Sequence, residues 1–279
     1  MSTDSLLKNR NFVFFLSIRW FYSVAIQSIT LTVGWQVYIL TGNPLDLGLI
    51  GLAQVFPIFL FILPSGVIAD KFDRKIVICL CTIVHLLVAV YLLYYSLSGP
   101  TSIWPILIAL LVHGTARAMY QPSLSAILPN IVEKKVFPNA TAYNSSVGKL
   151  GHLIGPLISG VIISFYDTKV YIFAIICFAI SIISTLFLKN PKNPNNLKSV
   201  SLSVVISGFV YVWKTRLVLG TMSIDLFAVL FGGIMGMLPI FAIDILKIGP
   251  EGLGLLRTMP AVGGVLTGIL LTQLPPINN

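Results

Sequence analysis

The sequence predicts an all-α membrane protein, and composition and apolar run length are the two observations that predict it. Of 279 residues, 56% are hydrophobic and only 10% are charged, and the mean hydropathy is +0.94. Soluble domains carry about 25% charged residues, so a water-facing globule is excluded. The apolar runs reach roughly 20 residues or more, the length that a helix needs to cross the ~30 Å hydrocarbon core and about twice that of a membrane β-strand.

Eight membrane-spanning helices are expected, with a polar linker rich in Asn and Pro after the sixth. A weakly amphipathic stretch over 198–214 is expected to lie along the membrane surface. The chain thus divides into a six-helix N-terminal half (1–188), a cytoplasmic linker with an amphipathic segment (189–214) and an incomplete C-terminal half of two helices (215–279). The expected spans are 12–40, 45–69, 76–97, 102–127, 139–165, 169–188, 217–243 and 252–274.

The distribution of Lys and Arg between alternate loops predicts the orientation, because cytoplasmic loops carry an excess of both. One side has only Lys169 and Lys247. The N-terminus and the linker are therefore expected in the cytoplasm, and the protein in the inner (plasma) membrane with several passes. The net charge of +9 then reflects topology and does not indicate a nucleic-acid partner. The other side carries Lys8, Arg10, Lys71, Arg74, Lys75, Lys134, Lys135, Lys189, Lys192, Lys198, Lys214 and Arg216.

An internal repeat with an offset of 206 residues relates the first two expected spans to the last two. Residues 17–21 align with 223–227, Pro44 with Pro250, and 47–49 with 253–255. Duplicated halves are one of the known transporter architectures. A complete second half at this offset would end near residue 394, so we expect a chain that stops after the eighth helix, with about four helices missing.

The loop after the second span carries a recognisable motif, which reads Gly66-Val-Ile-Ala-Asp70-Lys71-Phe-Asp-Arg74-Lys75. It resembles the signature loop of the major facilitator superfamily, and Asp73 replaces the usual Gly. The resemblance implies a major-facilitator-type helical bundle, in which this cytoplasmic loop holds the inner helix ends together and gates the transport cycle. The gating residues carried over are Gly66, Asp70, Lys71, Arg74 and Lys75.

The fifth span contains a second motif, formed by Gly151, Gly155, Pro156 and Gly160. Small residues four apart allow close helix approach, and Pro kinks a helix. The pattern resembles the fifth-helix motif often associated with exporters, although generic helix packing explains it as well. With Thr41-Gly42-Asn43-Pro44 and Leu128-Pro129, the chain most resembles the branch that contains enterobactin (siderophore) and drug exporters.

Ionisable residues inside the spans indicate a functional cavity, because they are costly in the bilayer. Four of them lie roughly 12–15 Å from the cytoplasmic helix ends, near mid-bilayer: Arg19, Arg117, Lys149 and Asp225. Other polar residues follow at helical spacing on the same helix faces. Structural pairing or snorkelling to the interface explains the cations as well, and a buried hydrogen-bonded role explains His113. The expected substrate and proton cavity comprises Arg19, Gln27, His113, Arg117, Gln121, Lys149 and Asp225.

The chain shows no sign of an enzyme, a cofactor site or a metal site. Its three cysteines lie in apolar runs without disulfide or metal spacing, and the sequence lacks a phosphate-binding loop. The expectation is a proton antiporter that exports a small amphipathic or anionic compound, siderophore- or drug-like, by alternating access. Its partners would be the lipid bilayer, the small-molecule substrate and protons, with a monomer expected at full length. The alternatives are an importer of the same fold and a truncated, non-transporting membrane protein.

Overall fold

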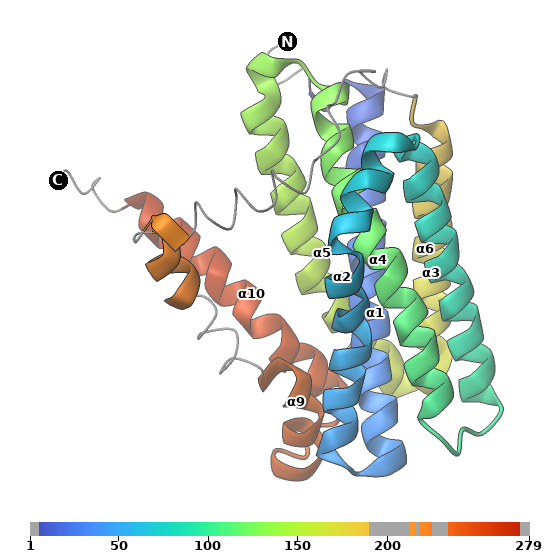
Figure 1. Cartoon of the computed structure of the whole chain (residues 1–279). Coiled ribbons are helices and arrows are strands. Elements are labelled where there is room, and N and C mark those ends of the chain that lie inside the picture. The colour runs from blue at the N-terminus through green and yellow to red at the C-terminus, as the bar shows by residue number, and fades with distance from the viewer. Residues whose placement is uncertain (1–5, 190–212, 216–217, 225–233, 274–279) are drawn as a thin grey trace.

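The computed structural model describes residues 6–189, 213–215, 218–224 and 234–273 of the chain. Within these ranges every regular element is a helix, which confirms the predicted all-α class (Figure 1). The expected amphipathic segment and most of the linker fall on residues 190–212 and lie outside the described part. The long helices are α1 (Arg10–Thr41), α2 (Pro44–Lys71), α3 (Arg74–Leu97), α4 (Trp104–Ile131), α5 (Phe137–Tyr166), α6 (Val170–Phe187) and α10 (Gly249–Gln273).

Local sequence explains where the first helices begin and end. The Asn9 side chain caps α1 by accepting a 3.0 Å hydrogen bond from the Asn11 amide. Gly42 ends α1 with φ 61°, a left-handed conformation that Gly adopts without strain. Asn43 then caps α2, and Pro44 occupies the first helical turn, where its missing N–H costs nothing. The Thr41–Pro44 turn is therefore as tight as its composition predicts.

Helices α1 to α6 form one bundle with an apolar core. Helix α1 packs on α5 and α6, α2 packs on α4, and α3 packs on α4 and α6. In Figure 1 the bundle has an upper end, where α1 begins and α6 finishes, and a lower end, where the α1–α2 turn lies. The fully buried aromatic side chains of the core are Phe12, Phe15, Tyr120, Tyr171 and Phe178.

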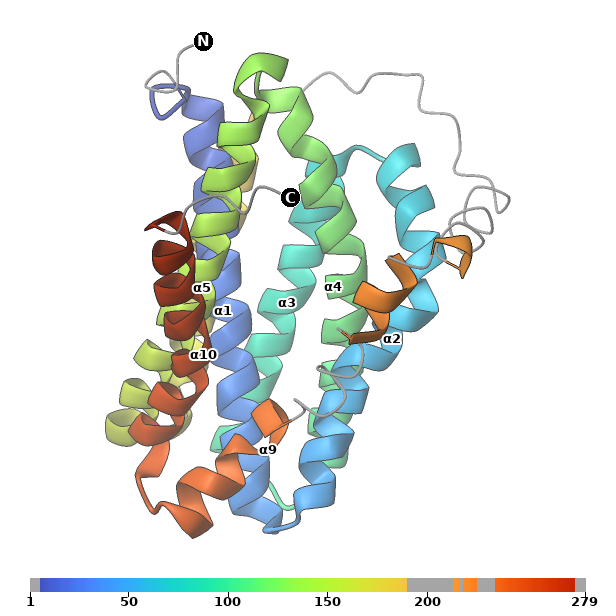
Figure 2. The same ribbon diagram turned by 90° about the vertical axis from the view of Figure 1, so that its left-hand side faces the viewer.

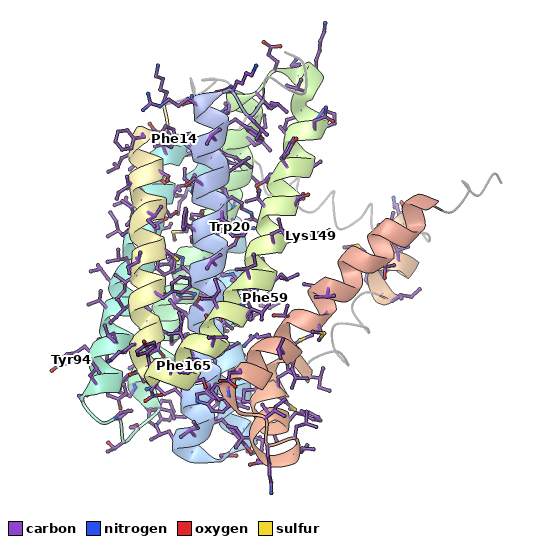
Figure 3. The ribbon with its side chains drawn as sticks, turned by 180° about the vertical axis from the view of Figure 1, so that it is seen from behind. Phe14, Trp20, Phe59, Tyr94, Lys149 and Phe165 are labelled. Carbon is purple, nitrogen blue, oxygen red and sulfur yellow. The ribbon has the colours of Figure 1, made fainter. Side chains whose placement is uncertain are left out.

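The outside of the bundle is apolar, as a lipid-facing surface must be. Phe59, Tyr94 and Phe165 are each more than 70% exposed, on three different helices (Figure 3). By length and hydropathy, the described residues contain four membrane-crossing segments: Arg10–Thr41, Pro44–Phe61, Arg74–Leu97 and Lys134–Phe187, the last of which holds both α5 and α6. Helix α4 is long enough but is not among them, because polar residues along one face lower its hydropathy.

The expected seventh and eighth spans are described in part. The seventh appears as α9 (Ile234–Ile240) followed by a π-helix, Phe241–Ile245, and it contacts α1 and α2. Helix α10 packs on α5 near the lower end and then diverges from it toward its own end (Figure 1), so that α10 lies in front of α5 in the view of Figure 2. Pro250 stands at the start of α10 as Pro44 stands at the start of α2, with the offset of 206 residues that the repeat has.

Candidate functional site

Arg19 lies inside the bundle, where α1, α4 and α5 meet. Its Nη1 donates a 3.3 Å hydrogen bond to Oε1 of Gln121 on α4. Its guanidinium lies directly on Gly148 of α5, because a Cβ built there would be only 2.8 Å from Nε and Nη2. Nε is buried and has no hydrogen-bond partner among the described residues. Arg19 is thus half-buried between helices with its buried Nε–H unused, a costly arrangement for a purely structural residue.

A second polar contact joins α1 to α5 two turns further along. Gln27 Nε2 and His152 Nδ1 are within hydrogen-bond distance. Lys149 lies one turn before His152, is exposed, and stands at about the mid-height of the bundle beside Trp20 (Figure 3). Gln27 and Lys149 therefore lie at the same α1–α5 interface as Arg19. Lys149 forms no hydrogen bond or ion pair with a described residue.

The α4 stripe of His113, Arg117 and Gln121 runs from the core to the bundle surface. His113 is fully buried, Arg117 is half-buried and Gln121 is exposed. Arg117 acts electrostatically on His113 and on His85, and no described residue forms an ion pair or hydrogen bond with it. Asp225, another residue of the expected cavity, lies outside the described residues.

Sequence reasoning missed the partners of His113. Nδ1 of His113 lies 3.0 Å from Nδ1 of His85 on α3, and Nε2 of His85 lies 3.0 Å from the Tyr22 hydroxyl on α1. The signal that could have found His85 is the presence of an ionisable residue inside an apolar span, because the pairing across 28 residues depends on how α3 meets α4.

The signature loop holds upper helix ends together. The Arg74 guanidinium, almost fully buried, donates from Nη1 to the Ala126 carbonyl of α4 at 2.8 Å. Lys75 Nζ donates to the carbonyls of Leu186 and Leu188, at 2.8 and 2.7 Å, and thereby caps the end of α6. The replacement of Gly by Asp73 has a local reason, since its carboxylate accepts from the Lys75 amide and caps α3.

The other loop residues contribute less to this network. Asp70 lies in the last turn of α2, but its side chain is outside the described part. Lys71 is exposed. A Cβ built on Gly66 meets no described atom within 4 Å.

The fifth-span motif serves two interfaces. A Cβ on Gly151 would lie 2.7 Å from Cβ of Ser23, and one on Gly155 would lie 2.8 Å from Cβ of Gln27, so both glycines let α1 approach. A Cβ on Gly160 would lie 2.6 Å from the Pro250 carbonyl of α10. The backbone of Pro156 also faces α10, because its carbonyl is 2.7 Å from a Cβ built on Gly254.

Two hydroxyl–carboxylate hydrogen bonds tie the lower end of the bundle to the segment after the linker. The Tyr38 hydroxyl on α1 donates to Asp244 in the π-helix. The Ser164 hydroxyl on α5 donates to Glu251 in the first turn of α10. We call these two bonds the lower clasp. Further along α10, the Thr258 hydroxyl also donates to the Leu153 carbonyl of α5, at 3.1 Å.

Comparisons with known proteins agree with this architecture. Residues 11–277 match the family model described as "Transmembrane secretion effector". The chain is 28% identical over 246 residues to the staphyloferrin A transporter of Staphylococcus aureus, covering 86% of this chain and 61% of that protein. It is 20% identical over 241 residues to macrolide efflux protein A of Streptococcus pyogenes, covering 83% and 58%. The chain thus spans about three-fifths of the length of these relatives.

Solved structures share the fold. A bacterial homologue of the human lysosomal transporter Spinster, in an inward-facing, unoccupied conformation, superimposes with a TM-score of 0.67 at 17% identity, over 97% of this chain and 65% of that chain. The signature loop and the family match over nearly the whole length agree with this fold and with a multi-pass membrane protein. The chain belongs to the transmembrane secretion effector family of the major facilitator superfamily.

Proposed function

We propose that this chain takes part in the proton-coupled efflux of a small amphipathic or anionic organic compound, by alternating access across the plasma membrane with its N-terminus in the cytoplasm. The observation that carries the proposal is the position of Arg19. Arg19 is half-buried, bonds only a neutral amide among the described residues and has a buried, unpaired Nε, so its guanidinium can form charge-assisted hydrogen bonds with an anion.

Neighbouring groups support an anionic or polyhydroxylated substrate. Arg117 adds a second positive charge at the α4 stripe, and Lys149 adds a third on α5. Gln27 and Gln121 supply amides that accept or donate hydrogen bonds to a neutral part of the substrate. An amphipathic substrate would suit such a site, because small-molecule sites combine a few placed polar groups with a mostly apolar lining.

The lower clasp and the divergence of α10 support an alternating-access mechanism. With Tyr38–Asp244 and Ser164–Glu251 in place, the lower end is held closed, while α10 leaves α5 toward the upper end (Figure 3). If the upper end is cytoplasmic, this is an inward-open arrangement. Rocking of the two helical groups about the midplane residues would then exchange the open and the closed end.

The printed names of the relatives favour efflux and offer two substrate classes. The family model is described by secretion, one relative is a macrolide efflux protein and another transports staphyloferrin A. Applied to this chain, these names are proposals. The cations at Arg19 and Arg117 favour the anionic class over a neutral or cationic drug.

Inside-out membrane vesicles that contain the full chain test the proposal, with carboxyfluorescein as the anionic, amphipathic probe. We expect the dye to accumulate when the vesicle interior is acidified, and an uncoupler to abolish the accumulation. The Arg19→Gln variant should accumulate the dye at least about tenfold more slowly, because hydrogen bonds to charged groups contribute about 1.5–3 kcal/mol. The matched control is Arg10→Gln, which removes an exposed arginine at the start of the same helix.

Other outcomes separate the alternatives. Accumulation in right-side-out vesicles, under an inward proton gradient, would make the chain an importer. Saturable binding of the dye without accumulation in either orientation would favour the non-transporting membrane protein. Equal accumulation by Arg19→Gln and the unaltered chain would remove Arg19 from the site.

A further inference from the structure

Three polar side chains form a continuous hydrogen-bonded chain through the interior of the six-helix bundle. Tyr22 of α1, His85 of α3 and His113 of α4 are 4%, 0% and 0% exposed. The Tyr22 hydroxyl and Nε2 of His85 are 3.0 Å apart, and Nδ1 of His85 and Nδ1 of His113 are also 3.0 Å apart. The chain ends at Nε2 of His113, which is buried and has no hydrogen-bond partner among the described residues.

Aromatic rings enclose this chain. Phe178 of α6 stacks on the His85 ring, with centroids 5.6 Å apart and 14° between the planes. Tyr120 of α4 stacks on Tyr22 at 3.5 Å, and its own hydroxyl is buried without a described partner. The titratable and charged groups that act electrostatically on the chain are Arg19 of α1, Cys81 of α3, and Arg117 and Tyr120 of α4.

This environment keeps both imidazoles neutral in the packed bundle. An imidazolium would be a buried charge, one helical turn from Arg117 in the case of His113, and neither ring bonds a carboxylate among the described residues. Two neutral rings that meet through Nδ1 atoms must contain one Nδ1–H donor and one Nδ1 acceptor. Whichever Nδ1 is the donor, the Nε2 of that ring is unprotonated and the Nε2 of the other ring is protonated, because a neutral ring has a single N–H.

Two proton arrangements satisfy the observed distances. In the first, Tyr22 O–H donates to His85 Nε2, and His85 Nδ1–H donates to His113 Nδ1. His113 then carries its own proton on Nε2. In the second, His113 Nδ1–H donates to His85 Nδ1, His85 Nε2–H donates to the Tyr22 oxygen, and His113 Nε2 has a free lone pair. Both arrangements keep the same heavy-atom positions and the same total charge.

We propose that Tyr22, His85 and His113 form a proton relay through the six-helix bundle. His113 Nε2 is buried in this structure, so the relay begins when water reaches it as the bundle opens. Starting from the second arrangement, a proton from that water forms an N–H bond at His113 Nε2. The His113 Nδ1–H bond breaks as its proton passes to His85 Nδ1. The His85 Nε2–H bond breaks as its proton passes to the Tyr22 oxygen, which releases its original proton to water. One proton enters and one leaves, and the first arrangement results.

The relay gives this bundle a proton path that contains no carboxylate. Its role in transport rests on the proposed proton-coupled function. The exchange of protons among Tyr22, His85 and His113 does not. The two can therefore be tested separately.

Nitrogen-15 NMR of the full chain, labelled at histidine and purified in micelles, tests the relay directly. The chain has only three histidines, so single substitutions assign every ring. We expect His85 and His113 to show ring-nitrogen shifts intermediate between protonated and unprotonated values from pH 6 to 8, because each ring exchanges between two tautomers. His152→Gln is the matched control and should leave both signals unchanged. Single fixed tautomers in both rings would overturn the relay.

Two variants extend the test. Tyr22→Phe keeps the ring stack and removes only the hydroxyl, so it should slow the exchange and give separate tautomer signals. Tyr22→Phe also provides the test if a second variant, His85→Gln, does not fold. Ring-nitrogen shifts that stay averaged in Tyr22→Phe would contradict the relay. In the carboxyfluorescein vesicles, His85→Gln or Tyr22→Phe should flatten the pH profile of accumulation. An unaltered pH profile would overturn the transport role, and failure of the unaltered chain to transport would count against the proposed function alone.

Discussion

The Tyr38 hydroxyl donates a hydrogen bond to the Asp244 carboxylate, and the two residues are 206 positions apart, which is the offset of the internal repeat. Equivalent residues of two repeats meet only near the axis that relates them. The contact therefore marks where the first and seventh helices approach each other, at the lower end of the bundle, and it makes half of the lower clasp.

Loss of the Tyr38 hydroxyl should open this end. Tyr38→Phe removes a hydrogen bond to a charged group, which contributes about 1.5–3 kcal/mol. The equilibrium constant between the closed and the open lower end should then shift by roughly ten- to a hundredfold toward the open form. Spin labels at Ile39 and Ile245, both about 60% exposed, would report longer distances by electron–electron double resonance.

The control for this experiment is Tyr94→Phe. Tyr94 is an exposed tyrosine near the same end, and its hydroxyl makes no hydrogen bond with a described residue. Identical distance distributions in Tyr38→Phe and the unaltered chain would show that the clasp does not hold the lower end closed.

A side chain at position 148 should displace Arg19. In Gly148→Ala the new Cβ would lie 2.8 Å from the guanidinium, so the guanidinium must move from its present position beside Gln121. We expect Gly148→Ala to slow carboxyfluorescein accumulation about as much as Arg19→Gln does. Gly263→Ala is the control, since a Cβ there meets no described atom within 4 Å. Full activity in Gly148→Ala would mean that the position of Arg19 on α5 is unimportant.

The α5–α10 interface should be sensitive to a single methyl group. In Gly160→Ala the Cβ would lie 2.6 Å from the Pro250 carbonyl, a backbone atom that cannot rotate away. Overpacking of this kind costs about 1–3 kcal/mol. Thermal unfolding in detergent should therefore show a lower midpoint for Gly160→Ala.

Gly48→Ala provides the comparison of opposite sign. Its Cβ meets nothing within 4 Å, and Ala in a helix interior is favoured over Gly by about 0.5–1 kcal/mol. The midpoint should stay the same or rise. A similar fall in both variants would indicate a general effect of substitution and not the contact with α10.

Removal of the Lys75 ammonium should loosen the upper end of α6. Lys75→Met keeps the length of the side chain and loses the two hydrogen bonds to the Leu186 and Leu188 carbonyls. At about 0.5–1.5 kcal/mol for each bond, we expect faster amide hydrogen exchange over the last turn of α6. Lys71→Met, an exposed lysine in the same loop, should leave that exchange unchanged. Equal protection in both variants would exclude Lys75 as a cap.

The sequence alone determined the helical class, the places where α1 to α3 begin and the family. Apolar length decides that a segment crosses the bilayer as a helix, and Asn9, Gly42 and Asn43 act within one turn of their own positions. The signature loop was readable for the same reason, since its spacing is local. Even Asp73, the departure from the family pattern, caps α3 through its own neighbour.

Only the tertiary structure decided which polar groups meet. The His85–His113 contact, the seat of Arg19 on Gly148 and the Tyr38–Asp244 bond each join residues of different helices, from 28 to 206 positions apart. Helical periodicity places a residue on a face of its own helix, but the crossing of two helices depends on how all their side chains interdigitate. A shift of one residue along the contact between two helices turns a side chain away from its partner. Sequence spacing therefore predicted that His113, Arg117 and Gln121 share a helix face, but it could not predict which residues contact them.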